Sequence, residues 1–256
     1  MTVLHQISAQ VQDRLGICMG PHKDYLLASR LEKLQTQEGV DDLASFLEDL
    51  AAGDHQALDA LSRHMTTNHT YFFREAEHFS FLRDKLIEQG ASRPRIWSAA
   101  GSSGEEAYSL AMVLAEGGLA DYLILVSDVN TDVLRIAQEG VYDVARASRV
   151  PPALSQKYLV PHPEGLQMKE TLRRHLRFQH LNLTQEWDLE APLDAIFCRN
   201  VFIYFDEVTI SHVLDRLVAS LRPGGWLFLG QTEGFHLPKG TRRVGLATFQ
   251  KFGNPA

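Results

Sequence analysis

The chain has 256 residues, 45% of them hydrophobic and 22% charged, and its formal charge at pH 7 is −7. This composition is typical of a globular protein with a hydrophobic core, and the acidic balance argues against general binding to nucleic acids. No apolar run approaches the roughly 20 residues that a membrane-spanning helix needs. We therefore expect a protein that neither inserts into a membrane nor binds nucleic acid.

Cysteine and histidine usage gives two further expectations. The chain has only two cysteines, Cys18 and Cys198, and no recognisable leader segment, which favours a reducing, cytoplasmic location. Its 11 histidines lack the close spacings of metal sites, so no metal is expected.

Residues 1–64 are expected to form a separate domain of three or four short helices. Apolar side chains recur there at helical spacing, and glycines separate the segments. Asp41 or Asp42 is placed to cap the helix that ends at Leu50. This domain is more acidic than the rest of the chain, with five basic and ten acidic residues.

Residues 65–94 are expected to form a linker that includes a lid helix. A dense run of polar residues stands here just before an aromatic pair. One interpretation is that Thr66 or Thr67 caps the helix that follows. The other is a lid over a cofactor, formed by Asn68, Thr70 and Arg74.

From Arg95 the pattern changes to alternating strands and helices. Strands are predicted at 96–98, 123–127, 176–180, 193–198 and 226–230, and helices at 104–115, 131–138 and 208–221. This alternation predicts a Rossmann-like α/β domain over residues 95–256, with a parallel sheet covered by helices on both faces. The proline-bearing stretch at about 141–175 is too long for an ordinary connection, so it predicts a small inserted β-subdomain.

The turn after the first predicted strand is the most informative part of the chain. Small residues from Ala99 to Gly104 end the strand and open a helix, an arrangement that lets the backbone approach a bound cofactor closely. Glu105 and Glu106 follow at once, where a pyrophosphate would favour a helix start without anions. Two carboxylates fit a cofactor with a positive charge and an amino group, such as S-adenosylmethionine.

Polar residues also follow the other predicted strands, where ligands of open α/β sheets bind. Asp128 is placed to accept ribose hydroxyls, unless it caps the next helix. Asn182 and Leu183 follow the third strand, and Asn182 has the alternative of capping a turn. Arg199 and Asn200 follow the fourth strand, and Arg199 has the alternative of an ion pair between elements.

Six stretches carry a family resemblance. They are TTNHTYFFRE (66–75), WSAAGSSGEEAYS (97–109), SDVNTDVL (127–134), FQHLNL (178–183), DAIFCRNVFIYFD (194–206) and LRPGGWLFLGQTEGF (221–235). In this order, with a helical N-terminal domain and a proline-rich insert, the chain resembles the CheR family of chemotaxis receptor methyltransferases. The resemblance implies methyl transfer from S-adenosylmethionine to glutamate side chains on the cytoplasmic helices of chemoreceptors, which gives glutamyl methyl esters.

The resemblance also implies site residues. It implies cofactor contacts at Asn68, Thr70, Arg74, Glu105, Asp128, Asn182, Leu183, Arg199 and Asn200. Arg74 and Tyr204 match the positions closest to the transferred methyl and are therefore implied to be catalytic. A free glutamate, with a pKa of about 4.3, is already ionised at neutral pH, so the reaction needs neither a general base nor a metal.

A basic zone in the insert is a candidate for receptor docking. Residues 144–179 hold seven basic and two acidic residues, which indicates either a solvated face or a surface for an acidic partner. The docking interpretation involves Arg146, Arg149, Lys169, Arg173, Arg174 and Arg177. Family members that tether to a C-terminal receptor pentapeptide carry a glycine-bearing loop in the insert, and residues 158–166 are shorter than that loop. This favours action without the pentapeptide.

Three other classes of protein fit parts of the pattern. A Rossmann-type methyltransferase that acts on another protein or a small molecule shares most of the cofactor features. An NAD-dependent dehydrogenase fits less well, because Ala99 replaces the first glycine of the fingerprint and two glutamates crowd the helix start. A degenerate methyltransferase used only for binding is disfavoured, since Asn68, Arg74 and Asp128 are all present.

Overall fold

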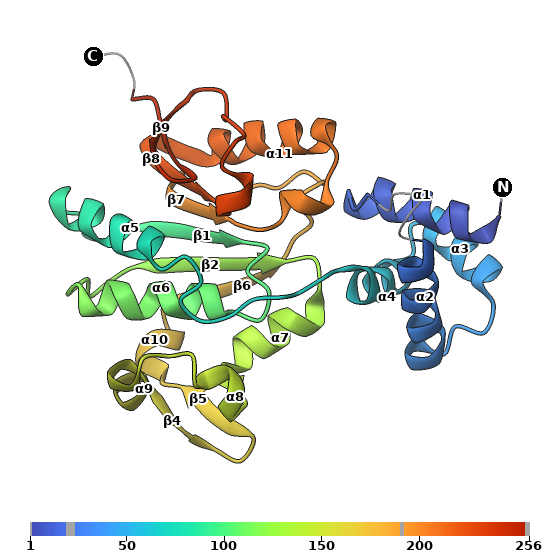
Figure 1. Ribbon diagram of the computed structural model, residues 1–256, viewed down its shortest axis with the longest axis horizontal. Coiled ribbons are helices and arrows are strands. Elements are labelled where there is room, and N and C mark those ends of the chain that lie inside the picture. Colours follow the sequence, from blue (N-terminus) through green and yellow to red (C-terminus); the bar gives the residue numbers. More distant parts are fainter. Residues whose placement is uncertain (1, 19–23, 190–191, 254–256) are drawn as a thin grey trace.

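The computed structural model describes residues 2–18, 24–189 and 192–253. Within these residues the N-terminal part is helical, as the sequence predicts (Figure 1). Its helices are α1 (Val3–Leu15), α2 (Asp24–Glu38), α3 (Leu43–Ala52) and α4 (His55–Met65). Their apolar faces form a core of their own, with Ile7, Leu34 and Leu61 fully buried. Asp42 caps α3, since its carboxylate accepts hydrogen bonds from the backbone N–H groups of Ala44 and Ser45.

The segment after α4 is not helical at its start. Thr66 terminates α4, and its hydroxyl donates to the carbonyl of Ser62 at 2.9 Å. The next helix, α5 (Glu77–Glu88), begins only after a series of turns, with Ala76 at its N-cap. The interpretation of Thr66 or Thr67 as the cap of a following helix is therefore wrong. Polar residues 66–70 remain available for other contacts.

A seven-stranded sheet forms the centre of the second part, in the order β6-β2-β1-β7-β8-β10-β9. Its elements in chain order are β1 (Arg95–Ala99), α6 (Glu105–Glu116), β2 (Leu123–Asp128), α7 (Thr131–Glu139), β6 (Leu176–His180), β7 (Leu193–Cys198), a 3-10 turn (Phe202–Tyr204), α11 (Glu207–Ser220), β8 (Leu221–Leu229), a second 3-10 turn (Gln231–Glu233), β9 (Thr241–Gly245) and β10 (Thr248–Lys251). The first five strands in this order are parallel, and the direction of strand succession reverses between β1 and β7. Ligands of open α/β sheets bind at such a reversal.

The five predicted strands are parallel, as expected, and two further strands extend the sheet at its far edge. β9 and β10 form an antiparallel hairpin, and β10 pairs antiparallel with β8. The turn of this hairpin contains Leu246 and Ala247 rather than the Asn-Gly or Asp-Gly pair that signals a hairpin in a sequence, and Ala247 takes up the positive φ of 48°. The sequence between these two short strands therefore contains no residues that mark a hairpin turn.

Two apolar layers cover the sheet. Phe79 on α5 and Leu110 on α6 join one core with Phe197 and Phe228. α11 packs on the opposite face in a second core that contains Trp97. Both faces are thus buried, as expected for parallel strands with helices on either side. Among the described residues, no helix combines the length and the apolar character needed to cross a membrane.

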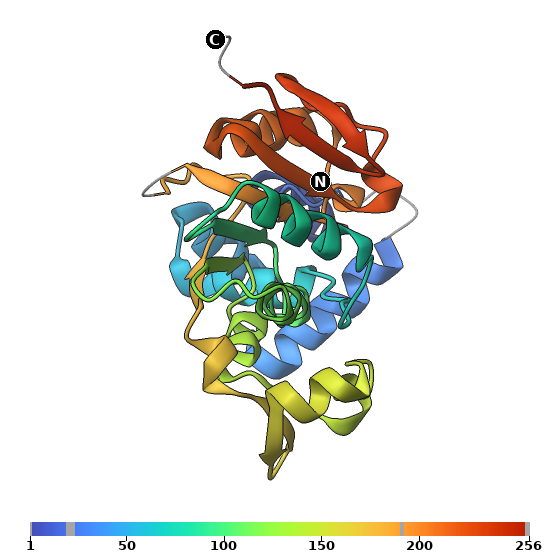
Figure 2. The ribbon, with the colours of Figure 1, turned by 90° about the vertical axis from the view of Figure 1, so that its left-hand side faces the viewer.

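The insert is a separate small sheet with helices around it, which projects below the main sheet (Figure 2). Its elements are β3 (Val141–Tyr142), α8 (Val144–Ala147), α9 (Pro152–Tyr158), β4 (Leu159–His162), β5 (Gly165–Met168) and α10 (Glu170–Arg173), and its strand order is β3-β5-β4. Gly165 is required at the start of β5, because a Cβ there would lie 2.2 Å from the carbonyl oxygen of Tyr142. The predicted inserted β-subdomain is therefore confirmed.

Candidate functional site

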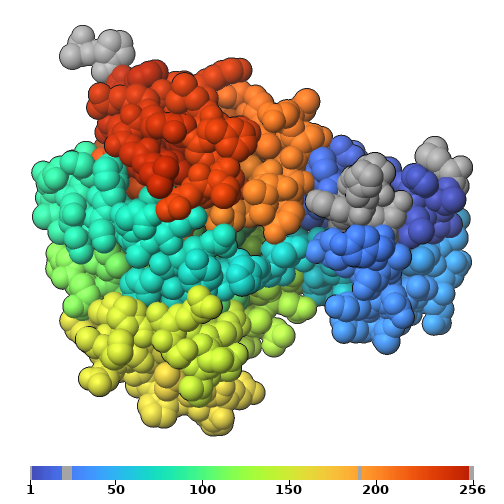
Figure 3. Space-filling model, in the orientation of Figure 1, coloured from blue at the N-terminus to red at the C-terminus, as the bar shows by residue number. Residues whose placement is uncertain are grey.

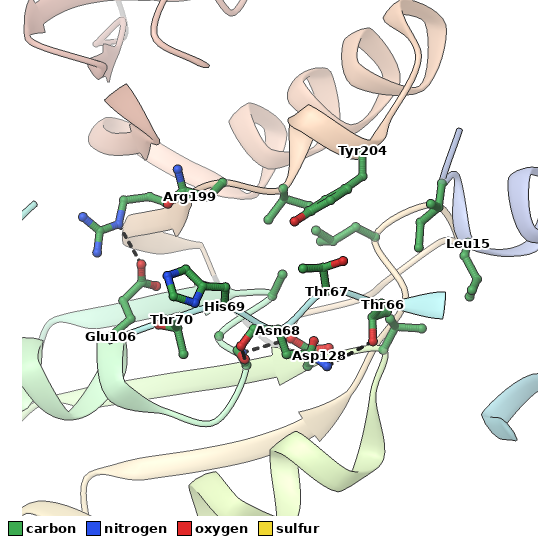
Figure 4. A pocket seen from close by; sticks show the side chains of 18 of the residues that line it. Leu15, Thr66, Thr67, Asn68, His69, Thr70, Glu106, Asp128, Arg199 and Tyr204 are labelled. Atoms are coloured by element: carbon green, nitrogen blue, oxygen red, sulfur yellow. Dashed lines mark hydrogen bonds and ion pairs between the residues drawn. The ribbon is translucent and has the colours of Figure 1, made fainter. Parts of the chain in front are cut away.

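A cavity opens where the strand order reverses, at the carboxyl ends of the parallel strands (Figure 4). Three parts of the chain enclose it: the strand ends, the end of α1 and the segment after α4. The lining residues are Leu15, Ile17, residues 66–70, Arg74, Ala100, Gly101, Ser102, Glu106, Asp128, Val129, residues 181–183, residues 199–201, Tyr204 and Phe205. Of the ten site positions expected from the sequence, the cavity lining includes all but Glu105.

Asp128 is prepared to accept a hydrogen-bonding ligand. One of its carboxylate oxygens accepts the N–H of Asn130 at 2.9 Å and the other accepts the N–H of Ser102 at 3.0 Å, and the side chain is buried. Burial raises the pKa of Asp128, although these backbone N–H groups oppose the rise. The N-cap of α7 is Asn130, so the capping alternative for Asp128 is excluded. A carboxylate has about four acceptor sites, so Asp128 retains capacity for a hydroxyl donor.

The glycine turn is joined to Asp128, because the backbone N–H of Ser102 donates to the Asp128 carboxylate. A Cβ on Gly101 would lie 2.7 Å from the Val126 side chain and 2.8 Å from the Ser98 hydroxyl, so no larger residue fits without a shift. This places the backbone of Gly101 and Ser102 directly at the cavity wall.

The segment after α4 is fixed to the rim through Thr66. The hydroxyl of Thr66 accepts hydrogen bonds from the side-chain amides of Asn130 at 3.0 Å and Asn68 at 3.2 Å. Arg30 on α2 donates to the carbonyl of Met65 and to the hydroxyl of Thr67. This segment therefore forms one wall of the cavity, and Arg30 is a supporting residue that the sequence did not reveal.

Arg199 is the centre of a buried ion-pair cluster. Its Nε donates to Glu106 at 2.7 Å, and its Nη1 donates to the carbonyl of Arg74 at 2.9 Å and lies 3.5 Å from a carboxylate oxygen of Glu75. The side chain is 2% exposed and packs on the ring of Phe79. The ion-pair alternative for Arg199 is therefore confirmed. Its guanidinium holds the Arg74 backbone in place beside the cavity.

Glu105 is the expected site residue that the structure places elsewhere. It is 1% exposed and accepts a hydrogen bond from Nε of Arg146 at 3.0 Å and from the hydroxyl of Ser103 at 2.8 Å. The neighbouring Glu106 lines the cavity instead. Successive residues of a helix point about 100° apart, and the first helical turn directs Glu105 toward the insert. Glu105 therefore lies outside the cavity lining, where the sequence had placed a cofactor contact, and its neighbour Glu106 lies at the wall.

Asn182 and Tyr204 join the α/β domain to the helical domain. The amide of Asn182 donates to the carbonyl of Arg14 at 2.5 Å, and its oxygen accepts the N–H of Thr184 at 2.9 Å. The turn-cap alternative is therefore correct, although Asn182 also lines the cavity. The carbonyl of Tyr204 accepts the N–H of Cys18 at 2.8 Å, and Figure 4 shows the Tyr204 ring across the cavity from Thr67. Leu183 adds an apolar wall.

Glu233 is a positioning residue whose role the sequence did not indicate. Its buried carboxylate accepts three backbone N–H groups, those of Asn200 at 2.7 Å, Phe202 at 2.7 Å and Gly230 at 2.9 Å. Asn200 has a φ of 62°, in the left-handed region that a non-glycine residue rarely adopts. A Cβ on Gly230 would lie 2.6 Å from the Asn200 amide nitrogen. Glu233 and Gly230 together fix the loop that carries Asn200 and Tyr204.

We expect Glu233→Gln to lower the free energy of unfolding by about 1–3 kcal/mol and to weaken binding of S-adenosylhomocysteine. Glutamine has one acceptor oxygen, so at least one of the three N–H groups loses its partner and the loop shifts. Urea unfolding and calorimetric titration measure the two effects. Glu207→Gln, the same change at an exposed position, serves as the control. Equal behaviour of the two variants would refute the role of Glu233.

His78 supports the Arg199 cluster in its neutral form. Its Nε2 lies 2.9 Å from the carbonyl oxygen of Leu246, and its Nδ1 lies 3.5 Å from Nη1 of Arg199. Burial lowers the pKa of His78 below its ordinary value of 6.5. Arg199 lowers it further, whereas the bond to Leu246 and the carboxylates of Glu75 and Glu77 raise it. The folded protein therefore resists protonation of this imidazole.

As pH falls through 6.5, the ordinary pKa of His78, the unfolded state should gain a proton that the folded state does not take up. The free energy of unfolding is then expected to fall by about 1 kcal/mol between pH 7.5 and 5.5, because one pKa unit corresponds to 1.36 kcal/mol. His78→Gln, which retains a donor for Leu246, should reduce this pH dependence. Urea titrations of both proteins at the two pH values test it; identical pH dependences would exclude His78 as the source.

Among residues 2–18, 24–189 and 192–253, no group of three or more His, Cys, Asp or Glu side chains is arranged to hold a metal ion. The fold and cavity together define an α/β protein that binds a nucleoside-like ligand at its strand ends. A buried acid, a glycine turn and apolar walls at Val129 and Leu183 are features that suit such a ligand.

Comparison with known proteins gives the family. A family model described as the all-alpha domain of CheR methyltransferases matches residues 3–66, and the model of their SAM binding domain matches residues 68–249. The chemotaxis protein methyltransferase of Escherichia coli K12 is 37% identical over 244 residues, covering 91% of this chain and 85% of the relative. Chemotaxis protein methyltransferase 2 of Pseudomonas aeruginosa PAO1 is 39% identical over 258 residues, covering 94% of this chain and 91% of the relative.

The chain belongs to the CheR methyltransferase family and is an S-adenosylmethionine-dependent methyltransferase. The dehydrogenase and binding-only alternatives are therefore not favoured. The cavity at the strand ends lies within the part that matches the SAM binding domain, apart from residues 66–67 and the end of α1.

Proposed function

We propose that this chain transfers the methyl group of S-adenosylmethionine to glutamate side chains of chemoreceptors in the cytoplasm, forming glutamyl methyl esters. A carbon–oxygen bond forms as the carbon–sulfur bond breaks, and the electron pair of that bond goes to sulfur. The observation that carries the proposal is that Arg74, Asp128 and Tyr204 line one cavity in a chain of this family. The names of the relatives supply the chemotaxis context.

The residues at the cavity fit the nucleoside part of this cofactor. We assign Asp128 to the ribose hydroxyls, since its carboxylate lines the cavity and retains acceptor capacity beside its backbone hydrogen bonds. Leu183 and Val129 suit the adenine ring, and Asn68, Thr70 and Glu106 suit the amino-acid part. The backbone of Leu183 and Asn200 offers further contacts, whereas Asn182 and Arg199 act mainly by positioning.

We assign the reacting end of the cavity to Arg74 and Tyr204. When bound, S-adenosylmethionine supplies an electrophilic methyl group on a sulfonium, which is a good leaving group. Among the described residues, the Arg74 guanidinium donates to the carbonyl of His69 at 3.1 Å and pairs with no carboxylate, so it is available for a substrate carboxylate. The Tyr204 ring bounds the space for the methyl group and excludes water from it. Alignment of this kind supplies roughly 7–11 kcal/mol in favourable cases.

Transfer of a labelled methyl group tests the proposal. The protein is incubated with methyl-labelled S-adenosylmethionine and the cytoplasmic fragment of a chemoreceptor, with a glutamate-to-glutamine version of the fragment as the control. Base-labile label on the glutamate fragment alone is the expected result. Label that resists base, or label only on small molecules or other proteins, would instead favour the alternative methyltransferase with a different acceptor.

We also propose that the basic insert contributes to receptor docking. Its basic side chains differ in whether they already pair with other groups of this chain. Arg146 is engaged by Glu105, and Arg173 lies 3.7 Å from Glu170 and bonds to a backbone carbonyl. Arg174 is exposed, and its guanidinium donates to the ring of the neighbouring His175 rather than to any carboxylate of the described residues.

The double change Arg173→Glu and Arg174→Glu should raise the KM for the receptor fragment, because it reverses two charges on the basic face. We expect an effect of about fivefold or more at low salt and a smaller one at high salt, since exposed charges are screened. KM measured at two salt concentrations tests this, and an unchanged KM would remove the insert from docking. The free receptor pentapeptide, titrated against the protein, is expected not to bind.

A further inference from the structure

Two arginines from distant parts of the chain share one aromatic ring at the edge of the cavity. The guanidinium carbon of Arg149, in the insert, lies 4.7 Å from the centroid of the Tyr71 ring, and that of Arg74 lies 5.6 Å from the same centroid. Tyr71 follows the cavity-lining residue Thr70 directly and is partly exposed. In Figure 3 the yellow-green insert lies directly below the cyan segment that contains Tyr71.

Arg149 is an available cation in this insert. Arg146 is paired with Glu105, Lys157 with Glu116 and Arg173 with Glu170. Arg149 is exposed, and among the described residues no carboxylate lies within ion-pair distance of it. Its position is nevertheless defined, because its guanidinium lies over the Tyr71 ring in a cation–π contact.

We propose that Arg149 and Tyr71 form a subsite for a second carboxylate of the protein substrate, beside the acceptor carboxylate at Arg74. This rests on the proposed function. Two guanidinium groups on one ring repel each other in a chain that is otherwise acidic, and a pair of carboxylates relieves that repulsion. Carboxylates three or four residues apart on a helix lie on the same face, so one substrate helix can present two of them to the two arginines at this ring.

The contact with the ring explains why arginine and tyrosine serve here. A guanidinium held over a ring loses less freedom when it binds, and its N–H groups form a fork that donates to both oxygens of a carboxylate. The subsite orients the substrate helix, so that the acceptor carboxylate reaches Arg74 in the correct direction. Arg149 is thus a specificity-determining residue that does not touch the transferred methyl.

The test uses a chemoreceptor cytoplasmic fragment and a second version in which every acid within one helical turn of the methylated glutamate is glutamine. Arg149→Ala should raise the KM for the first fragment by about fivefold, as expected of a partly exposed ion pair, and should have no effect with the second. Arg93→Ala is the matched control, since this exposed arginine precedes β1 at the opposite end of the sheet. The Kd for S-adenosylhomocysteine reports whether each variant keeps its fold.

Changes at Tyr71 separate stacking from charge. Tyr71→Ala should raise the KM for the first fragment as much as Arg149→Ala does, and the double variant should raise it no further than either single change. Tyr71→Phe keeps the ring, so its KM is expected to be closer to that of the parent protein than the KM of Tyr71→Ala. Additive effects of the two alanine changes would show that the stack does not act as a unit and would overturn the proposal.

The remaining outcomes are also decisive. If Arg149→Ala changes the KM for both fragments equally, or if Arg93→Ala gives the same change, the effect is one of general charge and the subsite is refuted. If the parent protein methylates neither fragment, the proposed function fails and the subsite fails with it. Methylation by the parent without an effect of Arg149 refutes the subsite alone.

Discussion

Arg74→Ala should slow methyl transfer by about 10- to 150-fold, with most of the loss in kcat/KM for the receptor fragment. A hydrogen bond to a charged group contributes about 1.5–3 kcal/mol, and each 1.36 kcal/mol is tenfold in rate. Arg74 lines the cavity, and no described carboxylate competes for its guanidinium. The measurement is steady-state transfer of a labelled methyl group to the fragment.

Two controls make this result specific to Arg74. Binding of S-adenosylhomocysteine reports the integrity of the cavity, and Arg74→Lys retains the charge but not the planar fork. We expect the Arg74→Lys variant to transfer the methyl group faster than Arg74→Ala and more slowly than the parent protein. Turnover of Arg74→Ala within about threefold of the parent, which is less than about 1 kcal/mol, would show that Arg74 does not orient the substrate.

Arg199→Met should lower the free energy of unfolding by about 3–5 kcal/mol, the largest stability effect that we expect. The substitution keeps the apolar contact with Phe79 but leaves Glu106 and Glu75 without their buried cation. Their side chains are only 12% and 13% exposed, so solvent replaces little of the lost interaction. Urea unfolding at pH 7.5 measures the change.

A second substitution distinguishes the stranded charge from simple loss of packing. Arg199→Met combined with Glu106→Gln removes one of the two unpaired carboxylates, and it should recover part of the lost stability. If Arg199→Met lowers the free energy of unfolding by less than about 1 kcal/mol, the ion pairs of Arg199 contribute no more than exposed ones do. That result would contradict the role that we assign to their burial.

The sequence was informative where a local pattern reports a local structure. The apolar runs at 123–127 and 193–198 correspond to β2 and β7, and the small residues from Ala99 to Gly104 form the turn at the cavity. The hairpin of β9 and β10 was not predicted, because its turn at Leu246 and Ala247 lacks the residues that mark a hairpin. Pairing with β8 stabilises it instead.

The partner of a polar side chain was harder to predict. Glu105 and Glu106 are adjacent and chemically identical, yet one bonds to Arg146 of the insert and the other to Arg199 on the sheet. Their difference depends on the direction of each side chain from α6 and on segments more than 40 residues away. Glu233 is a similar case, since its three N–H partners come from two separate loops.

The sequence alone determined the order of helices and strands, the helical domain before an α/β domain, the inserted subdomain and the family of the chain. These features follow from periodicity, turn residues and motifs, which act over a few residues. The tertiary structure decided which carboxylate reaches the cavity, which loop Glu233 fixes and which two arginines meet on Tyr71. Such contacts join residues far apart in the chain, and their geometry exists only once the sheet, the insert and the helical domain have packed together.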